Sequence, residues 1–375
     1  MLKRRIVSFG LCLIIWLASI TPVWANSYEF SEAQILQAYN NSQPQLVRPI
    51  GETEPALRNL LAQISGELVI NHVQQLESTS RCVLDPGHAQ AAAYIKQSLV
   101  GLNYTPKVQS FYNSLTRGEE MQNIMIYKRG GDNAKRTHLI VAHWDSSPNR
   151  QFPPQCNSLG PGANDNGTGA AVLLEIARVL ANPRINFQDD IELVWLDAEE
   201  FGLLGSRYFV ERWATDRNAN PYDTQVGAVI NLDMVGYKGN KPQGEIWAIG
   251  IAGTSQALVQ EGAALAANYL PSALYKQYTI GDNYPPGSDP NRNSDHLSFW
   301  QTGLGTAIYL AQGVNSASIS DPKWHTPNDK LYDTTTGLMR LDAPMLADAS
   351  RIALMIIGTK ARIIPGKQRY TAPRD

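Results

Sequence analysis

The sequence predicts an α/β fold: a three-layer sandwich in which helices flank a mixed, mostly parallel central sheet. From residue 138 onward, short apolar runs alternate with stretches of helical periodicity. These runs are apolar on both faces, which is typical of parallel strands covered by helices on both sides. The 375 residues are 43% hydrophobic and 18% charged, so the chain has enough apolar sequence to bury a large core.

The parallel strands are expected at four apolar runs. These runs are residues 138–142, 191–196, 226–232 and 306–311. Two further strands are expected before them, over 106–112 and 122–128, and a Gly-Gly turn follows the second. In open sheets of this kind, ligands bind beyond the carboxyl ends of the strands, so functional residues should follow the runs.

Helices are expected before, between and after these strands. One spans 86–100, and the helix after the first apolar run has an apolar stripe on one side. On the opposite side of that helix, Glu175 and Arg178 are spaced to form a pair. A last helix near 342–358 is expected to end at Gly358.

Residues 1–25 have the three parts of a secretory signal peptide. Basic residues occupy 3–5, an apolar run occupies 6–20, and Val23 and Ala25 are small residues before the expected cleavage point. The alternative is an uncleaved membrane anchor, but this run is shorter than the roughly 20 residues that a spanning helix needs. The sequence therefore predicts a secreted or periplasmic protein with no membrane attachment after cleavage.

After the leader, one main domain is expected over 81–360. A helical extension over 26–80 is expected to pack on it, and a loose tail covers 361–375. Without the three basic residues of the leader, 29 basic and 34 acidic side chains leave a net charge of −5. This charge excludes a large basic surface of the kind that binds nucleic acid. The oligomeric state is not predicted.

Two cysteines remain after removal of the leader, Cys82 and Cys156. In an oxidising compartment such a pair can form a disulfide, which would stabilise the fold by closing a long loop. Cys156 lies in a loop rich in proline and glycine, just before a segment with candidate functional residues. The alternative is two unrelated free thiols. We expect the disulfide.

Residues with ligand or acid–base chemistry follow the apolar runs. They are His143 and Asp145 after the first run, Asp165 at the start of the next helix, Asp197, Glu199 and Glu200 after the second run, Asp233 after the third, and His325 after the fourth. Each alone has an ordinary explanation. Asp165 could cap a helix, and Glu199 and Glu200 could be a solvated pair.

Together these residues favour a metal site. Carboxylates gathered at one edge of a sheet repel one another unless cations neutralise them. Two histidines with several carboxylates form a nitrogen and oxygen ligand set that suits Zn²⁺. The set holds more acidic ligands than one ion needs, which indicates two ions with one carboxylate between them.

Five segments in this order carry a resemblance: HWD, GANDNGTGA, DAEEFGLLGSRYF, INLDMVG and WHTPND. They resemble the co-catalytic di-zinc aminopeptidases, a family that also contains glutaminyl cyclases and related zinc carboxypeptidases. The similarity covers roughly residues 80 to 360. It implies a zinc-dependent exopeptidase fold, with the main domain as the catalytic domain and two Zn²⁺ ions as cofactors.

The resemblance also implies a role for each ligand. Asp165 would bridge the two zinc ions. His143 and Asp233 would complete the coordination of one ion, and Glu200 and His325 that of the other.

Two more residues receive roles from the same resemblance. Glu199 would be the general base and not a ligand, and Asp145 would hold the His143 imidazole from behind. A cis peptide is frequent in the family after the bridging aspartate, here between Asp165 and Asn166.

Two substrate-binding residues are also proposed. Asp295, in the segment SDH, matches a family segment beside the substrate pocket, but an aspartate in this place is also an ordinary helix cap. Tyr284 could offer its phenol to a reaction oxyanion, although most loop tyrosines have no such role. Both assignments stay open at this stage.

The resulting prediction is an exported di-zinc metallo-aminopeptidase that hydrolyses the N-terminal bond of peptides with a free N-terminus. The first alternative is a glutaminyl cyclase-like aminoacyltransferase with one zinc, against which the loop at Asp165 argues. The second is a zinc carboxypeptidase or dipeptidase, which Arg207 and Arg292 keep open as possible carboxylate binders. The third, an inactive receptor domain, is disfavoured because all expected ligands are present.

Overall fold

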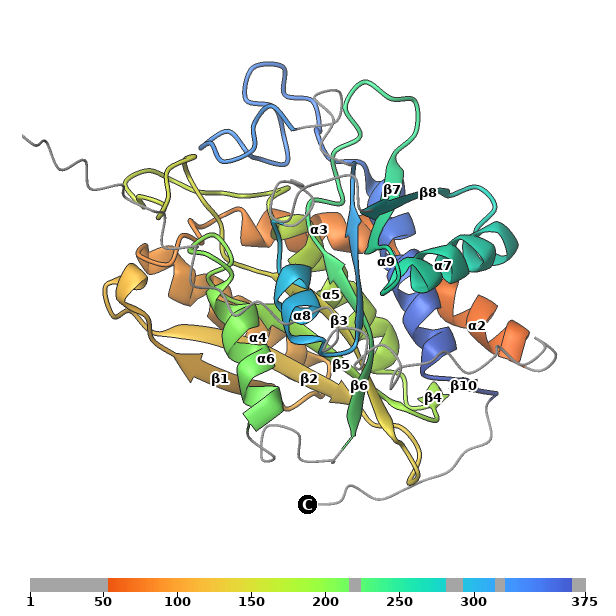
Figure 1. Ribbon diagram of the computed structural model, residues 1–375. Coiled ribbons are helices and arrows are strands. Elements are labelled where there is room, and N and C mark those ends of the chain that lie inside the picture. The colour runs from red at the N-terminus through yellow and green to blue at the C-terminus, as the bar shows by residue number, and fades with distance from the viewer. Residues whose placement is uncertain (1–52, 216–223, 281–292, 314–320, 366–375) are drawn as a thin grey trace, which may run out of the picture.

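The computed structural model describes residues 53–215, 224–280, 293–313 and 321–365 (Figure 1). The predicted signal peptide, the first part of the predicted N-terminal extension, most of the predicted tail and Tyr284 lie outside the described residues. Within the described ranges, no helix combines the length and the apolar character needed to cross a membrane.

A central sheet organises the described part of the chain. Its eight strands are β1 (Lys107–Phe111), β2 (Met121–Lys128), β3 (Arg136–His143), β5 (Asp190–Leu196), β6 (Gln225–Leu232), β7 (Glu245–Ile251), β8 (Leu274–Ile280) and β9 (Thr306–Ala311). Across the sheet the order is β1, β2, β5, β3, β6, β9, β7 and β8. The central neighbours β5, β3, β6 and β9 are parallel, as are β7 and β8, whereas the pairs β1–β2, β2–β5 and β7–β9 are antiparallel.

The predicted fold class is confirmed, and all six predicted strands are present in the sheet. Strands β7 and β8 were not predicted. In β8 the polar residues Lys276 and Gln277 interrupt the apolar pattern, because this strand lies at the edge of the sheet and is only partly covered. An edge strand does not need the two apolar faces that reveal the central strands.

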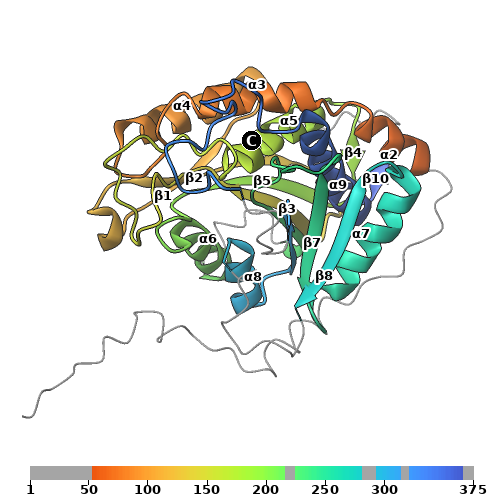
Figure 2. The ribbon, with the colours of Figure 1, turned by 90° about the horizontal axis from the view of Figure 1, so that it is seen from above.

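Helices form the two outer layers of the sandwich (Figure 2). One face of the sheet is covered by α2 (Thr53–Leu61), α3 (Gly66–Leu76), α4 (Pro86–Gly101), α5 (Gly167–Leu180), α7 (Gln256–Tyr269) and α9 (Ala343–Lys360). The other face is covered by α6 (Leu204–Thr215) and α8 (His296–Thr302). A short 3₁₀ helix (Ser114–Thr116) and a ribbon of β4 (Asn186–Phe187) with β10 (Ile363–Ile364) complete the described elements.

The end of one helix and the burial of one ion pair differ from what the sequence predicts. Helix α9 continues past Gly358 to Lys360, because the turn at Gly358 is buried beside Leu57 of α2, and packing extends the helix. The predicted pair of Glu175 and Arg178 is formed, at 2.7 Å between Oε2 and Nε. Glu175 is nevertheless fully buried, because the start of α3 covers it, and it accepts a hydrogen bond from the backbone N–H of Ser65 at 2.7 Å.

The predicted disulfide between Cys82 and Cys156 is formed, with 5.7 Å between the two Cα atoms. It joins the segment before α4 to the long loop between β3 and α5. Since this loop leads to Asp165, the disulfide tethers one border of the strand-end region that carries the predicted ligands.

Candidate metal centre

The predicted ligands meet at the carboxyl ends of the parallel strands. His143 is the last residue of β3, and Asp233 directly follows β6. Glu199 and Glu200 lie in the loop between β5 and α6. His325 comes from the segment between β9 and α9. Because these strands run in the same direction, residues that are far apart in sequence converge at one edge of the sheet.

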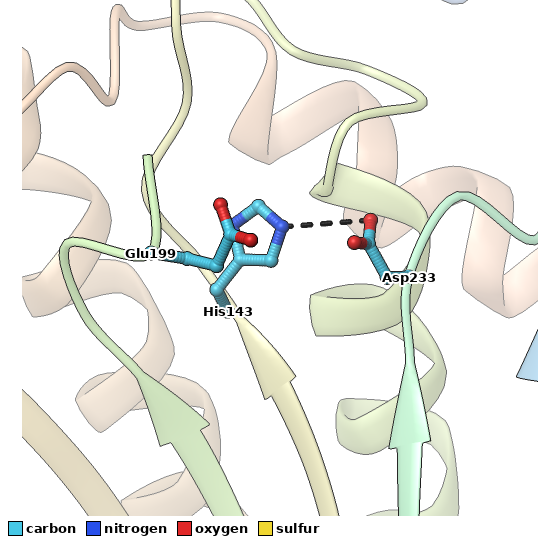
Figure 3. Close-up of side chains that lie close together, drawn as sticks. All are labelled: His143, Glu199 and Asp233. Carbon is cyan, nitrogen blue, oxygen red and sulfur yellow. Dashed lines mark ion pairs between the residues drawn. The ribbon is translucent and has the colours of Figure 1, made fainter. Parts of the chain in front are cut away.

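Their side chains form two groups in which ligand atoms lie within 4.8 Å of one another. One group contains His143, Glu199 and Asp233 (Figure 3). In this group, His143 Nε2 lies 3.5 Å from Asp233 Oδ1. Each group offers one imidazole nitrogen and two carboxylate oxygens, which is a suitable ligand set for a zinc ion.

The second group contains Asp165, Glu200 and His325. His325 Nε2 lies 2.9 Å from Glu200 Oε2 and 3.1 Å from Asp165 Oδ2. Every member of both groups was a candidate site residue in the sequence, and the structure places His143 near Asp233 and Glu200 near His325. The division of these residues between two ions stays a prediction.

Asp165 lies between the two groups. Its Oδ2 faces His325, while its Oδ1 lies 3.5 Å from Nε2 of His143. One carboxylate thus presents its two oxygens to two different histidines. This is the arrangement expected of a ligand that two ions share.

The backbone around Asp165 explains why its side chain can face the two histidines and does not cap the helix. The peptide bond between Asp165 and Asn166 is cis. Asn166, and not Asp165, caps helix α5, since its side chain accepts a hydrogen bond from the N–H of Gly169 at 3.0 Å. The helix-cap interpretation of Asp165 is therefore wrong.

Asp329 also supports the loop that carries Asp165. This residue was not identified from the sequence. Its carboxylate accepts hydrogen bonds from the backbone N–H groups of Asn164, at 3.1 Å, and Asp165, at 3.0 Å. Burial raises the pKa of Asp329 to about 7. Asp329 is the last residue of the WHTPND segment that contains His325, so the segment itself was the available signal.

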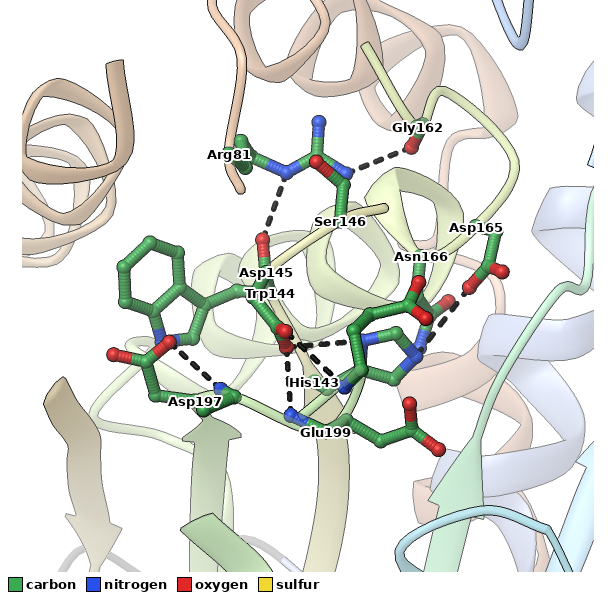
Figure 4. A network of polar contacts seen from close by, with 12 residues as sticks. Arg81, His143, Trp144, Asp145, Ser146, Gly162, Asp165, Asn166, Asp197 and Glu199 are labelled. Atoms are coloured by element: carbon green, nitrogen blue, oxygen red, sulfur yellow. Dashed lines mark hydrogen bonds and ion pairs between the residues drawn. The ribbon is translucent and has the colours of Figure 1, made fainter. Parts of the chain in front are cut away.

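Asp145 connects the two strand-end loops behind His143 (Figure 4). Its Oδ1 lies 3.3 Å from Nδ1 of His143. The same carboxylate accepts hydrogen bonds from the backbone N–H groups of Glu199, at 3.0 Å, and Glu200, at 3.2 Å. The predicted contact with His143 is present, and Asp145 additionally orients the loop that carries both glutamates.

Arg81 is a second supporting residue that the sequence did not reveal. Its fully buried guanidinium donates to the backbone oxygens of Trp144, at 2.7 Å, and Gly162, at 2.7 Å (Figure 4). It also donates to the oxygens of Leu76 and Pro161. All four partners are backbone carbonyl groups, three of them more than 60 residues from Arg81, so no side-chain pattern in the sequence could have indicated this role.

The electrostatics of the site reflect crowded, buried carboxyl groups. Burial raises the pKa of Glu200 to about 7 and that of Glu199 well above its usual range. Glu200, Asp295 and Asp233 add to the increase for Glu199, against the opposing effect of His143. Burial lowers the pKa of His325, but Glu200 and Asp165 raise it to about 10 overall. The site therefore favours bound positive charge, either as protons or as metal ions.

Asp295 lies close to this cluster but makes no capping bond. It occupies the residue before α8, where its side chain forms no hydrogen bond with the helix. It is fully buried, and both carboxylate oxygens lack a hydrogen-bond partner among the described residues. Burial raises its pKa to about 7. The helix-cap interpretation is therefore wrong, whereas its proposed role in substrate binding stays a prediction.

Comparison with known proteins is consistent with this site. Residues 123–346 match the sequence model of peptidase family M28. Aminopeptidase YwaD of Bacillus subtilis (strain 168) is 28% identical over 229 residues, which are 60% of this chain and 42% of that protein. Leucine aminopeptidase 2 of Trichophyton equinum is 30% identical over 180 residues, which are 47% of this chain and 33% of that protein. The matched parts thus span less than half the length of these relatives.

Solved structures show the same fold. The LapA aminopeptidase of Legionella pneumophila has a TM-score of 0.64 at 22% identity, covering 86% of this chain and 78% of that one. The glutaminyl cyclase of Porphyromonas gingivalis has a TM-score of 0.60 at 22% identity, covering 80% and 99%. The family match contains every member of both ligand groups and more than half of the sequence. The chain therefore belongs to peptidase family M28.

Proposed function

We propose that this protein is an exported di-zinc aminopeptidase that hydrolyses the first peptide bond of peptides with a free N-terminus. The observation that carries the proposal is the position of Asp165, whose two oxygens face the histidines of two separate ligand groups. Family M28 is zinc-dependent, so the chemistry of the proposed ions agrees with the family.

The donor atoms of the site fit zinc. Among the described residues, His143 Nε2, Glu200 Oε1 and Asp233 Oδ1 are buried without a hydrogen-bond partner. Such unpaired buried atoms are unfavourable unless another group binds them. Coordination of cations would satisfy them and would also reduce the repulsion between the carboxylates.

The proposed ligand assignment follows from these contacts. One ion would be held by His143, Asp233 and one oxygen of Asp165, and the other by Glu200, His325 and the second oxygen of Asp165. Zinc in such a site lowers the pKa of water toward about 7 and polarises a peptide carbonyl, which makes hydrolysis possible at neutral pH.

Glu199 would provide the acid–base chemistry. Its carboxylate belongs to the first group, beside His143 and Asp233. The backbone N–H of Glu199 donates to Asp145, and this hydrogen bond fixes the backbone from which the side chain extends. It would accept a proton from the attacking water and pass it to the amine that leaves. Burial raises the pKa of Glu199, so its carboxyl group can keep this proton between the two steps.

Selection for a free N-terminus would follow from the charge of the site. The cluster of Asp165, Glu199, Glu200, Asp233 and Asp295 favours the positive α-amino group of a peptide over a blocked, neutral one. Export is proposed from the leader over 1–25, and the disulfide is of the kind that forms in oxidising compartments.

A cyclase is the second candidate, because the structural relatives include glutaminyl cyclases. The presence of two ligand groups favours the peptidase, since a one-zinc enzyme would need only one of them. A carboxypeptidase would need a cation for the substrate carboxylate. Of the two arginines considered for this purpose, Arg207 lies on α6 and Arg292 lies outside the described residues.

One comparison of substrates tests the proposal. The purified protein is offered aminoacyl anilides with a free amine, the same compounds with an acetylated amine, and peptides with N-terminal glutamine. We expect hydrolysis of the free amines alone, lost with a chelator and restored by Zn²⁺. Equal hydrolysis of acetylated substrates would refute the aminopeptidase, and cyclisation of glutamine peptides without hydrolysis would identify a cyclase.

A further inference from the structure

A buried pair formed by His88 and Asp197 lies behind the loop that carries Glu199. His88 belongs to the first turn of α4, and Asp197 directly follows β5. Nε2 of His88 lies 2.8 Å from Oδ1 of Asp197. The exposed fraction is 6% for His88 and 0% for Asp197, so bulk water does not compete for this contact.

The Asp197 carboxylate organises the start of that loop. Its Oδ1 also accepts a hydrogen bond from the N–H of Ala198 at 2.8 Å, and its Oδ2 accepts one from the N–H of Gln122 at 2.7 Å. Ala198 has a φ of 54°, a left-handed conformation that is uncommon for a residue other than glycine. The contact with Asp197 stabilises this turn directly before Glu199.

Two carboxylates therefore hold three consecutive backbone N–H groups. Asp197 binds the N–H of Ala198, and Asp145 binds those of Glu199 and Glu200 (Figure 4). Asp145 also contacts His143, whereas Asp197 contacts His88. Each carboxylate that fixes the loop thus has its own histidine partner.

His88 also contacts the second strand-end loop. Its ring stacks on Trp144, with 4.3 Å between the ring centroids and 25° between the planes. Trp144 directly follows the ligand His143 and is fully buried. Its Nε1 donates to the backbone oxygen of Gln122, the same residue whose N–H binds Asp197. His88 therefore lies between the two segments that carry His143 and Glu199.

We infer that His88 is a positioning residue for Glu199, acting through its hydrogen bond to Asp197. This inference rests on the proposed function. A buried carboxylate that loses one of its donors must find another partner, which moves the backbone N–H groups it holds. A displacement of about 1 Å at a reacting group reduces a rate by about 100-fold, although His88 itself touches no substrate.

Two substitutions separate the hydrogen bond from the stacking. His88→Gln keeps an N–H donor at about the position of Nε2 but removes the ring. His88→Phe keeps a ring against Trp144 but removes the donor. We expect His88→Phe to lower kcat by about 10- to 100-fold with KM and bound zinc unchanged. We expect His88→Gln to keep kcat within about threefold of the unsubstituted enzyme, because the Asp197 contact persists.

A second readout does not depend on activity. Backbone amide exchange over residues 197–204 in the zinc-free protein should be faster in His88→Phe than in His88→Gln. His72→Phe is the matched control, since His72 forms its hydrogen bond with Tyr94, between α3 and α4. It should change neither kcat nor exchange over 197–204. If His88→Phe does not fold, His88→Leu replaces it in the same comparison.

The outcomes are separable. Unchanged kcat or unchanged exchange over 197–204 in His88→Phe would overturn the inference, as would equal losses of kcat in the Phe and Gln variants. An unsubstituted protein that cleaves no free-amine substrate would instead refute the proposed function, and the exchange measurement would still decide the positioning role.

Discussion

The Oδ2 atom of Asp329 accepts a hydrogen bond from the backbone N–H of Asp165 at 3.0 Å. This contact joins the segment of His325 to the loop that carries Asp165, whose two oxygens face His143 and His325. Two motifs that are about 160 residues apart are thereby joined through backbone contacts, in addition to the contact between His325 Nε2 and Asp165 Oδ2. Residues behind a metal site commonly change metal affinity by about 10- to 100-fold, because they orient the ligands.

Asp329→Asn is therefore expected to weaken zinc binding by about 10- to 100-fold. An amide has one acceptor oxygen, so one of the two backbone N–H groups would face a donor. Competition with a fluorescent chelator measures the affinity. Asp333→Asn is the control, because the carboxylate of Asp333 accepts hydrogen bonds from the backbone N–H groups of Thr335 and Thr336 in its own turn. Equal affinities in the two variants would contradict a supporting role for Asp329.

Glu199→Gln should retain both zinc ions and lose most activity, with kcat lower by about 100- to 10,000-fold. The amide cannot accept a proton, whereas the ligand atoms of His143, Asp165 and Asp233 are unchanged. Metal analysis and steady-state kinetics on one preparation test this. Glu67→Gln, on an exposed position of α3, is the control. Loss of zinc together with activity would show that Glu199 is a ligand and not the base.

Metal removal should produce a less stable protein. Zinc that binds only the folded state raises the melting temperature in proportion to the logarithm of its free concentration.

We expect two Zn²⁺ per chain, and about one in His325→Gln, which keeps the group of His143 and Asp233. Titration calorimetry of the zinc-free protein gives both numbers. A stoichiometry of one in the unsubstituted protein would favour the cyclase interpretation.

The double variant Cys82→Ser/Cys156→Ser should be less stable by about 4 kcal/mol on the chain-entropy model, because the two cysteines are separated by 74 residues. Urea unfolding of the zinc-loaded proteins measures the difference. Since Arg81 neighbours Cys82 and binds the carbonyl of Gly162, zinc affinity should fall as well. A difference in stability under about 1 kcal/mol would contradict this expectation.

Stability should depend on pH through Glu192, which lies far from the metal centre in β5. Burial raises its pKa to about 8, against smaller opposing effects of Tyr127 and Lys107. The folded state therefore holds the proton more tightly than the unfolded chain, and this contribution is lost as the pH rises from about 4.5 to about 8.

The variant Glu192→Gln cannot ionise, so it isolates this effect. Relative to the variant, the melting temperature of the unsubstituted protein should fall between pH 5 and about 8. Thermal unfolding at several pH values provides the comparison. A difference that stays constant over this range would rule out a raised pKa at Glu192.

The sequence predicted those strands of the sheet whose apolar runs are continuous. Strands β3, β5, β6 and β9 lie in the centre and are covered on both faces, so their residues are almost continuously apolar. Strand β8 was missed because an edge position tolerates polar residues. The ligand groups were predicted because parallel strands place their carboxyl ends at one edge, a consequence of direction alone.

The roles of other residues could not be predicted from the sequence. Arg81 binds backbone carbonyls, which every residue possesses, and His88 acquires its role only because α4 packs behind the loop of Asp197. The sequence offered Asp165 as a possible cap of α5, but Asn166 has that role because the side chain of Asp165 faces the histidines.

The sequence by itself thus determined the fold class, the family resemblance and the set of candidate ligand residues, because these depend on residue type and order along the chain. The tertiary structure shows that Asp165, to which the resemblance gave a bridging role, lies between the two histidines, and it decided which buried groups hold the loops in place. Those contacts join segments from tens to more than a hundred residues apart, and only the packed sheet brings them within hydrogen-bond distance.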